Sequence, residues 1–387
     1  MVVELVFVGL LEVSVIVLIG EYSGVHYCLA EALKRKGHDV TLISDGDAYK
    51  KFPSDITVPQ EHYTGMVKYI HLFLFFLGCT GMINYLKLKK RLSYIANIHT
   101  VQFINPVAIP SLGAIGNFLL FINFKKRADV VSLCALGDDR HWVMACIRKK
   151  FKYSALDRLF TGGLKGFLKY SYSLKYILSP MFVLLDAYVV SKSDIIVPGL
   201  TDYVLPYSNN KKSTGKIPLP IDISSMVRPE GSNYPIKIFH GWQTGKEAKK
   251  GNDILHAAAL KCVSSLGEGV VSYETVGGLP YSEYIKRFKE ADIFLDQVYS
   301  YDCGVNALLA MASGKVVFSG FESNCVEDIG VNATPSVDEV FYQIVSLIKN
   351  KERIDTIKYN AYEYVVKTHE SSIVADRYLK VWGIACN

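Results

Sequence analysis

The stretch from Asp302 to Gly314, DCGVNALLAMASG, combines residue types that could bind an anion at the edge of a sheet. It follows the apolar run DIFLDQ and precedes KVVFS, which predicts a strand, a loop, a short helix and a second strand. Ligands of open α/β sheets bind outside the carboxyl ends of the strands, where a loop meets a helix N-terminus. The backbone N–H groups of Gly304, Val305 and Asn306 would therefore point toward an anion. The alternative is an ordinary strand–loop–helix unit in which Gly304 supplies only a turn.

Two carboxylates follow another predicted strand in the first half of the chain. The run DVVSLCALGDD ends in Asp138 and Asp139, directly after a glycine. Carboxylates at the end of a strand are candidates for hydrogen bonds with the hydroxyl groups of a ligand in a cleft. Asp is also a favoured N-cap residue, so the alternative is that both residues cap the next helix.

The elements that would position these residues alternate between apolar strands and helices. Residues 14–47 are predicted to form a strand, a loop, a helix and a strand, with Gly20 and Gly24 bracketing the loop and Gly37 ending the helix. The continuous apolar run VIVLI is typical of a parallel sheet covered on both faces. The same alternation recurs from residue 236 to residue 319, so the sequence predicts an α/β protein. Residues 1–13 are expected to be an extra strand, an extension or a misplaced start.

The length and composition fit two domains. The chain has 387 residues, half of them hydrophobic, which is suited to two cores of about 150–200 residues each. A net charge of +6 is too mild, and its basic residues too local, for a nucleic-acid-binding protein. The eight cysteines form no C-x-x-C pair, which disfavours a zinc site and favours buried free thiols in a reducing compartment.

The stretch after Asp302 resembles the signature region of the glycosyltransferase group 1 family (family 4-like), which has the GT-B fold. The family frame is kept at Gly304, at residues 310–312 (AMA), at Gly314 and at residues 316–317 (VV), whereas Leu309 stands where the family has its second Glu. The resemblance implies two Rossmann-like domains that face a central cleft. Residues 1–215 would form the N-terminal, acceptor-side domain, residues 216–370 the C-terminal domain that binds a nucleotide-sugar, and residues 371–387 a C-terminal helix that crosses back to the first domain.

The resemblance also implies a donor site in the second domain. Lys246 and Lys250 would hold the donor diphosphate, because fixed cations stabilise the charge that a leaving nucleoside diphosphate gains. Asp302 would hold the donor sugar and share the catalytic role with the two lysines. The remaining donor-binding residues would be Gly241, Gly251, Tyr301, Cys303, Gly304, Val305, Asn306 and Glu322. An exposed lysine-rich loop is the alternative interpretation of the two lysines.

On the acceptor side, the resemblance places the first-domain loop at the cleft. The acceptor would be contacted by Gly20, Gly24, His26, His99, Asp138 and Asp139. A histidine next to a glycine loop often has a structural role instead.

Function follows from the same resemblance. It implies a glycosyltransferase that moves a sugar from a nucleotide-sugar co-substrate to a glycan or lipid-linked acceptor, with retention of configuration and with neither a metal nor a further cofactor. Such an enzyme would build surface polysaccharide at the cytoplasmic face of the membrane. Two alternatives stay open: a sugar-nucleotide epimerase, and a degenerate GT-B protein that binds a glycan or a partner without turnover, which Leu309 favours.

Two regions of the first domain suit an anionic membrane surface. Residues 66–86 contain the run IHLFLFFLGCTGMI, too short to span a bilayer and followed by four cations. It is expected to be either a buried helix with a basic end or a helix lying on a membrane. Residues 148–175 interleave basic and aromatic residues, a pattern typical of a surface that contacts anionic lipid or of a solvated helical face.

Overall fold

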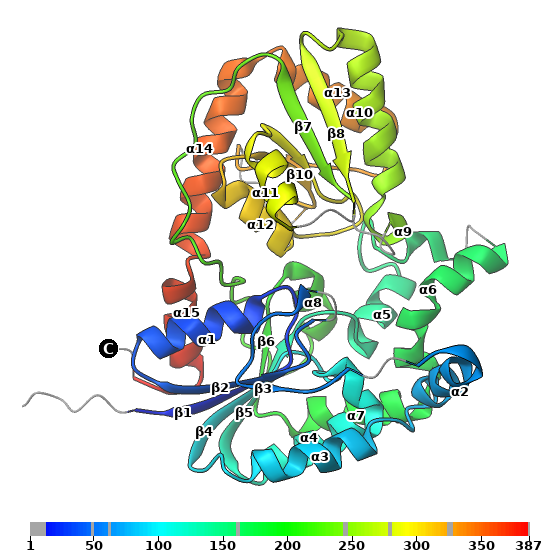
Figure 1. Ribbon diagram of the computed structural model, residues 1–387, viewed down its shortest axis with the longest axis vertical. Helices are drawn as coiled ribbons and strands as arrows, with labels where there is room; N and C mark the ends of the chain where they lie inside the picture. Colours follow the sequence, from blue (N-terminus) through cyan, green and yellow to red (C-terminus); the bar gives the residue numbers. More distant parts are fainter. Residues whose placement is uncertain are drawn as a thin grey trace, which may run out of the picture.

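The structure is a computed structural model that describes residues 13–47, 50–60, 63–159, 163–242, 247–277, 281–322 and 328–385. Figure 1 shows two α/β domains, one above the other, with the chain passing between them twice. The predicted α/β architecture with two Rossmann-like domains is confirmed. The expectation for residues 1–13 concerns a segment outside the described residues, apart from Val13.

The first domain is built on a six-stranded parallel sheet with the order β3-β2-β1-β4-β5-β6. Its strands are β1 (Val15–Ile19), β2 (Asp39–Ser44), β3 (Ile56–Thr57), β4 (Ile98–Phe103), β5 (Ala128–Ala135) and β6 (Ile195–Pro198). The central strand β1 is buried over its last four residues, as its unbroken apolar sequence predicts. The strand order reverses between β1 and β4, which is the point where ligands of such sheets bind.

Eight α-helices accompany the described part of this sheet. They are α1 (Val25–Arg35), α2 (Gly65–Phe76), α3 (Met82–Leu92), α4 (Gly113–Lys125), α5 (Arg140–Ile147), α6 (Gly163–Leu178), α7 (Pro180–Lys192) and α8 (Thr201–Tyr207). Single 3₁₀ turns lie at Pro110–Leu112 and Asp157–Leu159. The apolar run near residue 70 forms α2, none of whose residues is buried, so the buried-helix alternative for this run is wrong.

The second domain is built on a five-stranded parallel sheet with the order β11-β10-β9-β7-β8. Its strands are β7 (Ile236–Gly241), β8 (Val271–Val276), β9 (Ile293–Leu295), β10 (Val316–Ser319) and β11 (Val331–Asn332). Its helices are α9 (Glu247–Lys250), α10 (Asn252–Leu266), α11 (Tyr281–Lys289), α12 (Val305–Ala312), α13 (Val337–Ile348) and α14 (Lys351–Thr368). Here the order reverses between β7 and β9, so the second switch point faces the same gap between the domains (Figure 1).

The chain crosses between the domains at two neighbouring segments. Ile221 lies in the outward crossing and pairs with the return crossing, since its N–H donates to His369 O at 2.7 Å and its carbonyl accepts from Ser371 N at 3.0 Å. After this point α15 (Ser371–Val381) packs against α1, and Tyr378 and Trp382 are buried in the core of the first domain. The predicted C-terminal helix that crosses back to the first domain is therefore confirmed.

No single helix in the described ranges is long and apolar enough to cross a bilayer. The residues Tyr172–Leu178 of α6 and the whole of α7 reach the necessary length and composition only as a pair, which is bent by 75°.

Candidate active site

The carboxyl edges of the two sheets enclose a cleft of about 700 Å³. Its walls come from both domains: the loops after β1, β2 and β5 on one side, and Lys249, Gly304 and Val305 on the other. Residues of α2 and α6 also line the cleft. The space between the domains is therefore large enough for a small molecule.

Acidic side chains of the first domain line this cleft. The carboxylate of Glu21, at the end of β1, accepts the N–H groups of Gly24 at 2.7 Å and Tyr27 at 2.7 Å. Burial raises the pKa of Glu21 to about 7 despite these two donors. Burial likewise raises the pKa of Asp45, which follows β2. Burial therefore favours the protonated form of the Glu21 carboxyl group at the cleft wall.

Asp138 joins the two domains at the cleft. Its carboxylate lies 2.6 Å from Lys249 Nζ of α9, and the hydroxyl of Ser173 in α6 donates to the same oxygen. Burial alone would raise the pKa of Asp138, but the lysine and the hydroxyl outweigh it and hold that pKa below its usual value. Asp138 is thus an anion at the cleft wall, where the sequence predicted a carboxylate. The charged partner of this carboxylate is Lys249 of the second domain.

Lys250 lies at the second switch point. It follows β7, and its Nζ lies 2.7 Å from Oδ1 of Asp296 at the end of β9. The hydroxyl of Ser319 donates to the other Asp296 oxygen at 2.9 Å. Gly251 comes next in a left-handed conformation, where a Cβ would lie 2.4 Å from Val298 Cγ2, so only glycine fits without a shift. This turn holds the lysine at the carboxyl edge of the sheet and starts α10.

The predicted loop between a strand and a short helix is present, and Gly304 with Val305 lines the cleft. Gly304 is the N-cap of α12, which ends two residues before Gly314, as the sequence predicts. Asn306, in the first turn, is exposed. Cys303 turns inward, and burial raises the pKa of its thiol. The backbone of this loop is therefore the part that faces the cleft.

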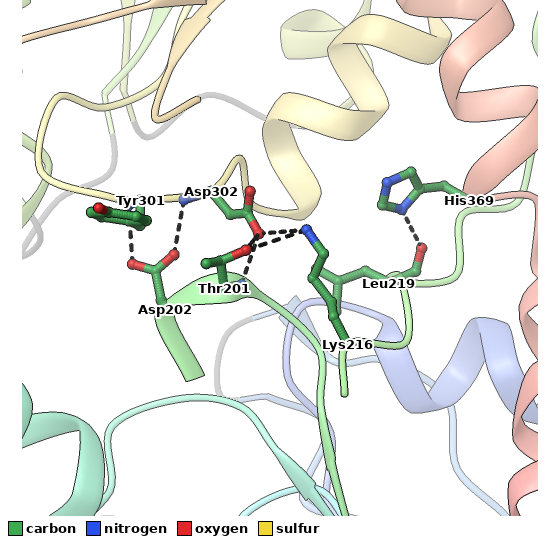
Figure 2. Close-up of polar contacts among 7 residues, drawn as sticks. All are labelled: Thr201, Asp202, Lys216, Leu219, Tyr301, Asp302 and His369. Carbon is green, nitrogen blue, oxygen red and sulfur yellow. Dashed lines mark hydrogen bonds and ion pairs between the residues drawn. The ribbon is translucent and has the colours of Figure 1, made fainter. Parts of the chain in front are cut away.

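Asp302 points away from that loop toward the domain junction (Figure 2). Its carboxylate accepts the backbone N–H and the hydroxyl of Thr201, each at 2.7 Å, and pairs with Lys216 at 2.9 Å. In return, the Asp202 carboxylate accepts the N–H groups of Tyr301 at 3.1 Å and Asp302 at 2.9 Å. These hydrogen bonds hold the loop against the N-terminus of α8. The carboxylate of Asp302 therefore connects the two domains and is not left available to a ligand.

Three predicted acceptor contacts are corrected by the structure. His26 is fully buried, its Nδ1 lies 2.8 Å from Gly20 O, and burial lowers its pKa to about 3, so it is a neutral core residue. His99 is the second residue of β4, at the edge of the sheet away from the cleft. Asp139 is fully buried and caps α5 by accepting Trp142 N at 2.7 Å, as the alternative interpretation holds.

The other predicted residues occupy supporting positions or lie outside the described ranges. Gly20 approaches Ala108 so closely that a Cβ would lie 2.2 Å from its carbonyl oxygen. Gly24 is the left-handed N-cap of α1, and Gly241 ends β7. Glu322 accepts from Asn332 Nδ2 at 3.0 Å. Lys246 lies outside the described residues, so its predicted role stays a prediction.

The sequence interpretation missed Glu21, Asp45, Asp47 and Lys249. The three acids could have been identified from the sequence, since Glu21 lies within two residues of the end of the first strand and Asp45 and Asp47 lie within three residues of the end of the second. Only the strand that ends near Asp138 was used to predict carboxylates in the cleft. Lys249 adjoins Lys250, and sequence alone does not tell which of two neighbouring lysines faces a cleft.

No group of three or more His, Cys, Asp or Glu side chains that could hold a metal ion is found among the residues that the structure describes.

Comparison with known proteins gives a result only at the level of structure. No protein-family model matches the chain, and no curated protein matches it by sequence. Sucrose-phosphate synthase from Thermosynechococcus elongatus superposes with a TM-score of 0.61 at 11% identity, covering 96% of this chain and 98% of that one. Anabaena HepE, in complex with UDP and glucose, superposes with a TM-score of 0.57 at 12% identity over 96% and 99% of the two chains.

The chain has the GT-B fold. A third solved structure with the same arrangement is a proposed UDP-N-acetylglucosamine 2-epimerase from Listeria monocytogenes, with a TM-score of 0.52 at 9% identity over 95% of each chain. At such identities the GT-B likeness establishes the fold, and the chemistry has to be argued from the cleft itself.

Proposed function

We propose that this protein is a glycosyltransferase that moves a sugar from a nucleotide-sugar donor to a glycan or lipid-linked acceptor. The observation that carries the proposal is the cleft, in which carboxylates of the first domain face Lys249 and the N-terminus of α12 in the second. Anionic side chains suit the hydroxyls of an acceptor, and cations with helix N–H groups suit a diphosphate. A GT-B cleft with this division of charge supports sugar transfer between two bound substrates.

The donor is a nucleoside diphosphate sugar, with a uridine nucleotide as the first candidate. Structures of Anabaena HepE, which has the same fold, hold UDP and UDP-glucose. In this chain Lys250, with Gly251 behind it, occupies the switch point of the second sheet, where the diphosphate would lie. The cations at 246, 249 and 250 would stabilise the leaving diphosphate, so the transfer is proposed to be metal-independent. The family resemblance is the basis for proposing that it also retains the configuration.

On the acceptor side, Glu21 and Asp138 are the proposed contacts to sugar hydroxyls. Glu21 has a pKa of about 7 because of burial, which suits a group that accepts a proton from a hydroxyl. The product would be a growing surface polysaccharide, assembled at the cytoplasmic face of the membrane.

A sugar-nucleotide epimerase is the second candidate, favoured by the Listeria structure and by the cleft carboxylates, with His71 also in the wall. A degenerate binding protein is the third, favoured by Leu309 in the position of the family's Glu.

One experiment separates the three candidate functions: the protein is incubated with UDP-sugars, with and without glycan or lipid-linked acceptors, and the products are analysed by mass spectrometry. Release of UDP with a glycosylated acceptor supports the transferase. A changed UDP-sugar without acceptor supports the epimerase, and binding without any product supports the degenerate protein.

A further inference from the structure

The helix α2 exposes apolar side chains on most of its surface. None of its twelve residues is buried, although its sequence is GMVKYIHLFLFF. Met66 is 78% exposed, Tyr69 72% and Phe73 63%. A second exposed apolar group lies at the start of α3, where Ile83 is 68% exposed. Contiguous exposed apolar surface of this kind marks a site for a protein partner or a membrane.

The segment of the sequence that contains α2 and α3 carries cations and no acid. From residue 62 to residue 128 the chain has no Asp or Glu and eight cations, namely Lys68, Lys87, Lys89, Lys90, Arg91, Lys125, Lys126 and Arg127. Three of them, residues 89–91, form the last turn of α3 and are exposed. An exposed apolar helix followed by exposed cations at the end of the next helix is complementary to an anionic bilayer surface. Two copies of this face would instead oppose like charges, which disfavours a symmetric dimer through α2.

The same helix forms part of the cleft wall. His71 and Phe75, one turn apart on α2, line the cleft, and so do Tyr172 and Tyr176 of α6. Figure 1 shows α2 and α6 as neighbours at one edge of the first domain. The exposed apolar surface is therefore continuous with the proposed acceptor side of the cleft.

The side chain of Lys175 packs between these two helices. Its buried Nζ lies 3.3 Å from the centroid of the Tyr172 ring and 4.6 Å from that of Phe75, with Tyr176 and Phe182 also within 5.3 Å. These ring contacts pack α6, α2 and α7 against one another. The exposed face of α2 thus has a fixed position relative to the cleft.

We propose that α2, with the adjoining start of α3, docks this protein onto an anionic lipid bilayer and holds the cleft beside its surface. The sugar-bearing head group of a lipid-linked acceptor then enters between His71 and Tyr172 while its hydrocarbon chain stays in the bilayer. The identity of the acceptor rests on the proposed function, whereas the docking itself does not. Tyr69 and Tyr94, both more than 70% exposed, suit the interfacial layer of the membrane.

The test is flotation of the full chain with vesicles of phosphatidylcholine alone and of phosphatidylcholine mixed with phosphatidylglycerol. The wild type binds the anionic vesicles, and binding weakens when salt rises from about 0.1 M to about 1 M, which shortens the Debye length from about 10 Å to about 3 Å. The double variant Ile70→Glu/Phe73→Glu lowers the partition coefficient at least about tenfold, equivalent to about 1.4 kcal/mol. The matched control Leu260→Glu/Tyr342→Glu, at exposed positions of the second domain, binds as the wild type does.

Absence of vesicle binding by the wild type overturns the proposal, and so does equal binding by the wild type and the α2 variant. A dimer that depends on Ile70 and Phe73, seen by light scattering without vesicle binding, overturns it in favour of a second copy. Titration of UDP into the α2 variant separates this outcome from the proposed function. The variant keeps wild-type nucleotide affinity, so loss of docking and failure of the donor site are distinguishable.

Discussion

Lys249 Nζ of the second domain lies 2.6 Å from Oδ2 of Asp138 in the first, at the wall of the cleft. The pair is one of several polar connections between the domains, together with Thr201 to Asp302 at the junction. Both connections lie near the carboxyl edges of the sheets, where ligands of open α/β sheets bind. The relative position of the two domains therefore depends on the residues that line or adjoin the cleft.

The first prediction concerns this pair. Both side chains are partly exposed, so a double-mutant cycle with Asp138→Asn and Lys249→Met is expected to give a coupling of only about 1 kcal/mol in the free energy of unfolding. Because the pKa of Asp138 is lowered in the folded state, this stabilisation is present above the ordinary pKa of about 3.9 and is lost as the pH falls below it. Urea unfolding at pH 7 and pH 3 measures both effects. Strictly additive single-variant effects at pH 7 would show that the pair contributes no coupling.

A second prediction separates two roles of Asp302. Its carboxylate is buried and has three donors, so Asp302→Asn is expected to lower the free energy of unfolding by about 2–3 kcal/mol. The affinity for UDP should change less than about twofold, an effect below 0.5 kcal/mol. The control Asp253→Asn, at an exposed ion pair with Arg158, should cost at most about 1 kcal/mol. Lost UDP binding with unchanged stability would instead restore the donor-binding role that the sequence predicted.

The third prediction follows from the raised pKa of Glu21. A carboxyl with a folded-state pKa of about 7 stabilises the fold most below its ordinary pKa of about 4.5, and this contribution disappears as the pH rises through 7. The free energy of unfolding should therefore fall by up to about 3 kcal/mol between pH 4.5 and pH 8 because of this group. Glu21→Gln should reduce that pH dependence. An identical pH dependence in the wild type and the variant would show that Glu21 titrates normally.

A fourth prediction concerns Lys175. Burial lowers its pKa well below the ordinary value, and its ammonium has no hydrogen-bond partner in the described part of the chain. Lys175→Met should fill the same aromatic site without a charge and stabilise the fold at pH 7 by about 1–4 kcal/mol. The gain should shrink toward pH 10, because a lysine with a lowered folded-state pKa becomes less costly as the pH rises. Destabilisation by this variant at pH 7 would mean that the cation–π contacts outweigh desolvation.

Much of the fold could be predicted because parallel strands are continuous apolar runs. The strand and helix from residue 15 to residue 35 and the helix that ends before Gly314 are local patterns, and the structure has them where the sequence indicates. The residues that line the cleft could not be predicted in the same way, because the order of the strands in the sheet decides which loops meet. Glu21 and Asp138 are far apart in sequence but follow β1 and β5 of one sheet, so both reach the same cleft.

Side-chain direction could not be predicted from residue type. Asp302 and Asp139 have the chemistry of sugar-binding carboxylates, but one is held by Thr201 and Lys216 and the other caps a helix. The partners that decide these roles come from other parts of the chain. His26 likewise lies next to the cleft loop in sequence and in the core in space.

The central claim is tested most directly by calorimetric titration of UDP into the wild type, Lys250→Gln and Lys261→Gln. Glutamine at 250 keeps a hydrogen bond for the buried Asp296 but removes the cation, and Lys261 is an exposed control at an ion pair with Asp338. The account predicts that UDP binds the wild type and the control equally. It predicts that Lys250→Gln weakens binding at least about tenfold, the loss of one charge-assisted hydrogen bond of about 1.5–3 kcal/mol. The account is contradicted if UDP and the other nucleoside diphosphates fail to bind the folded wild type, or if they bind Lys250→Gln with unchanged affinity.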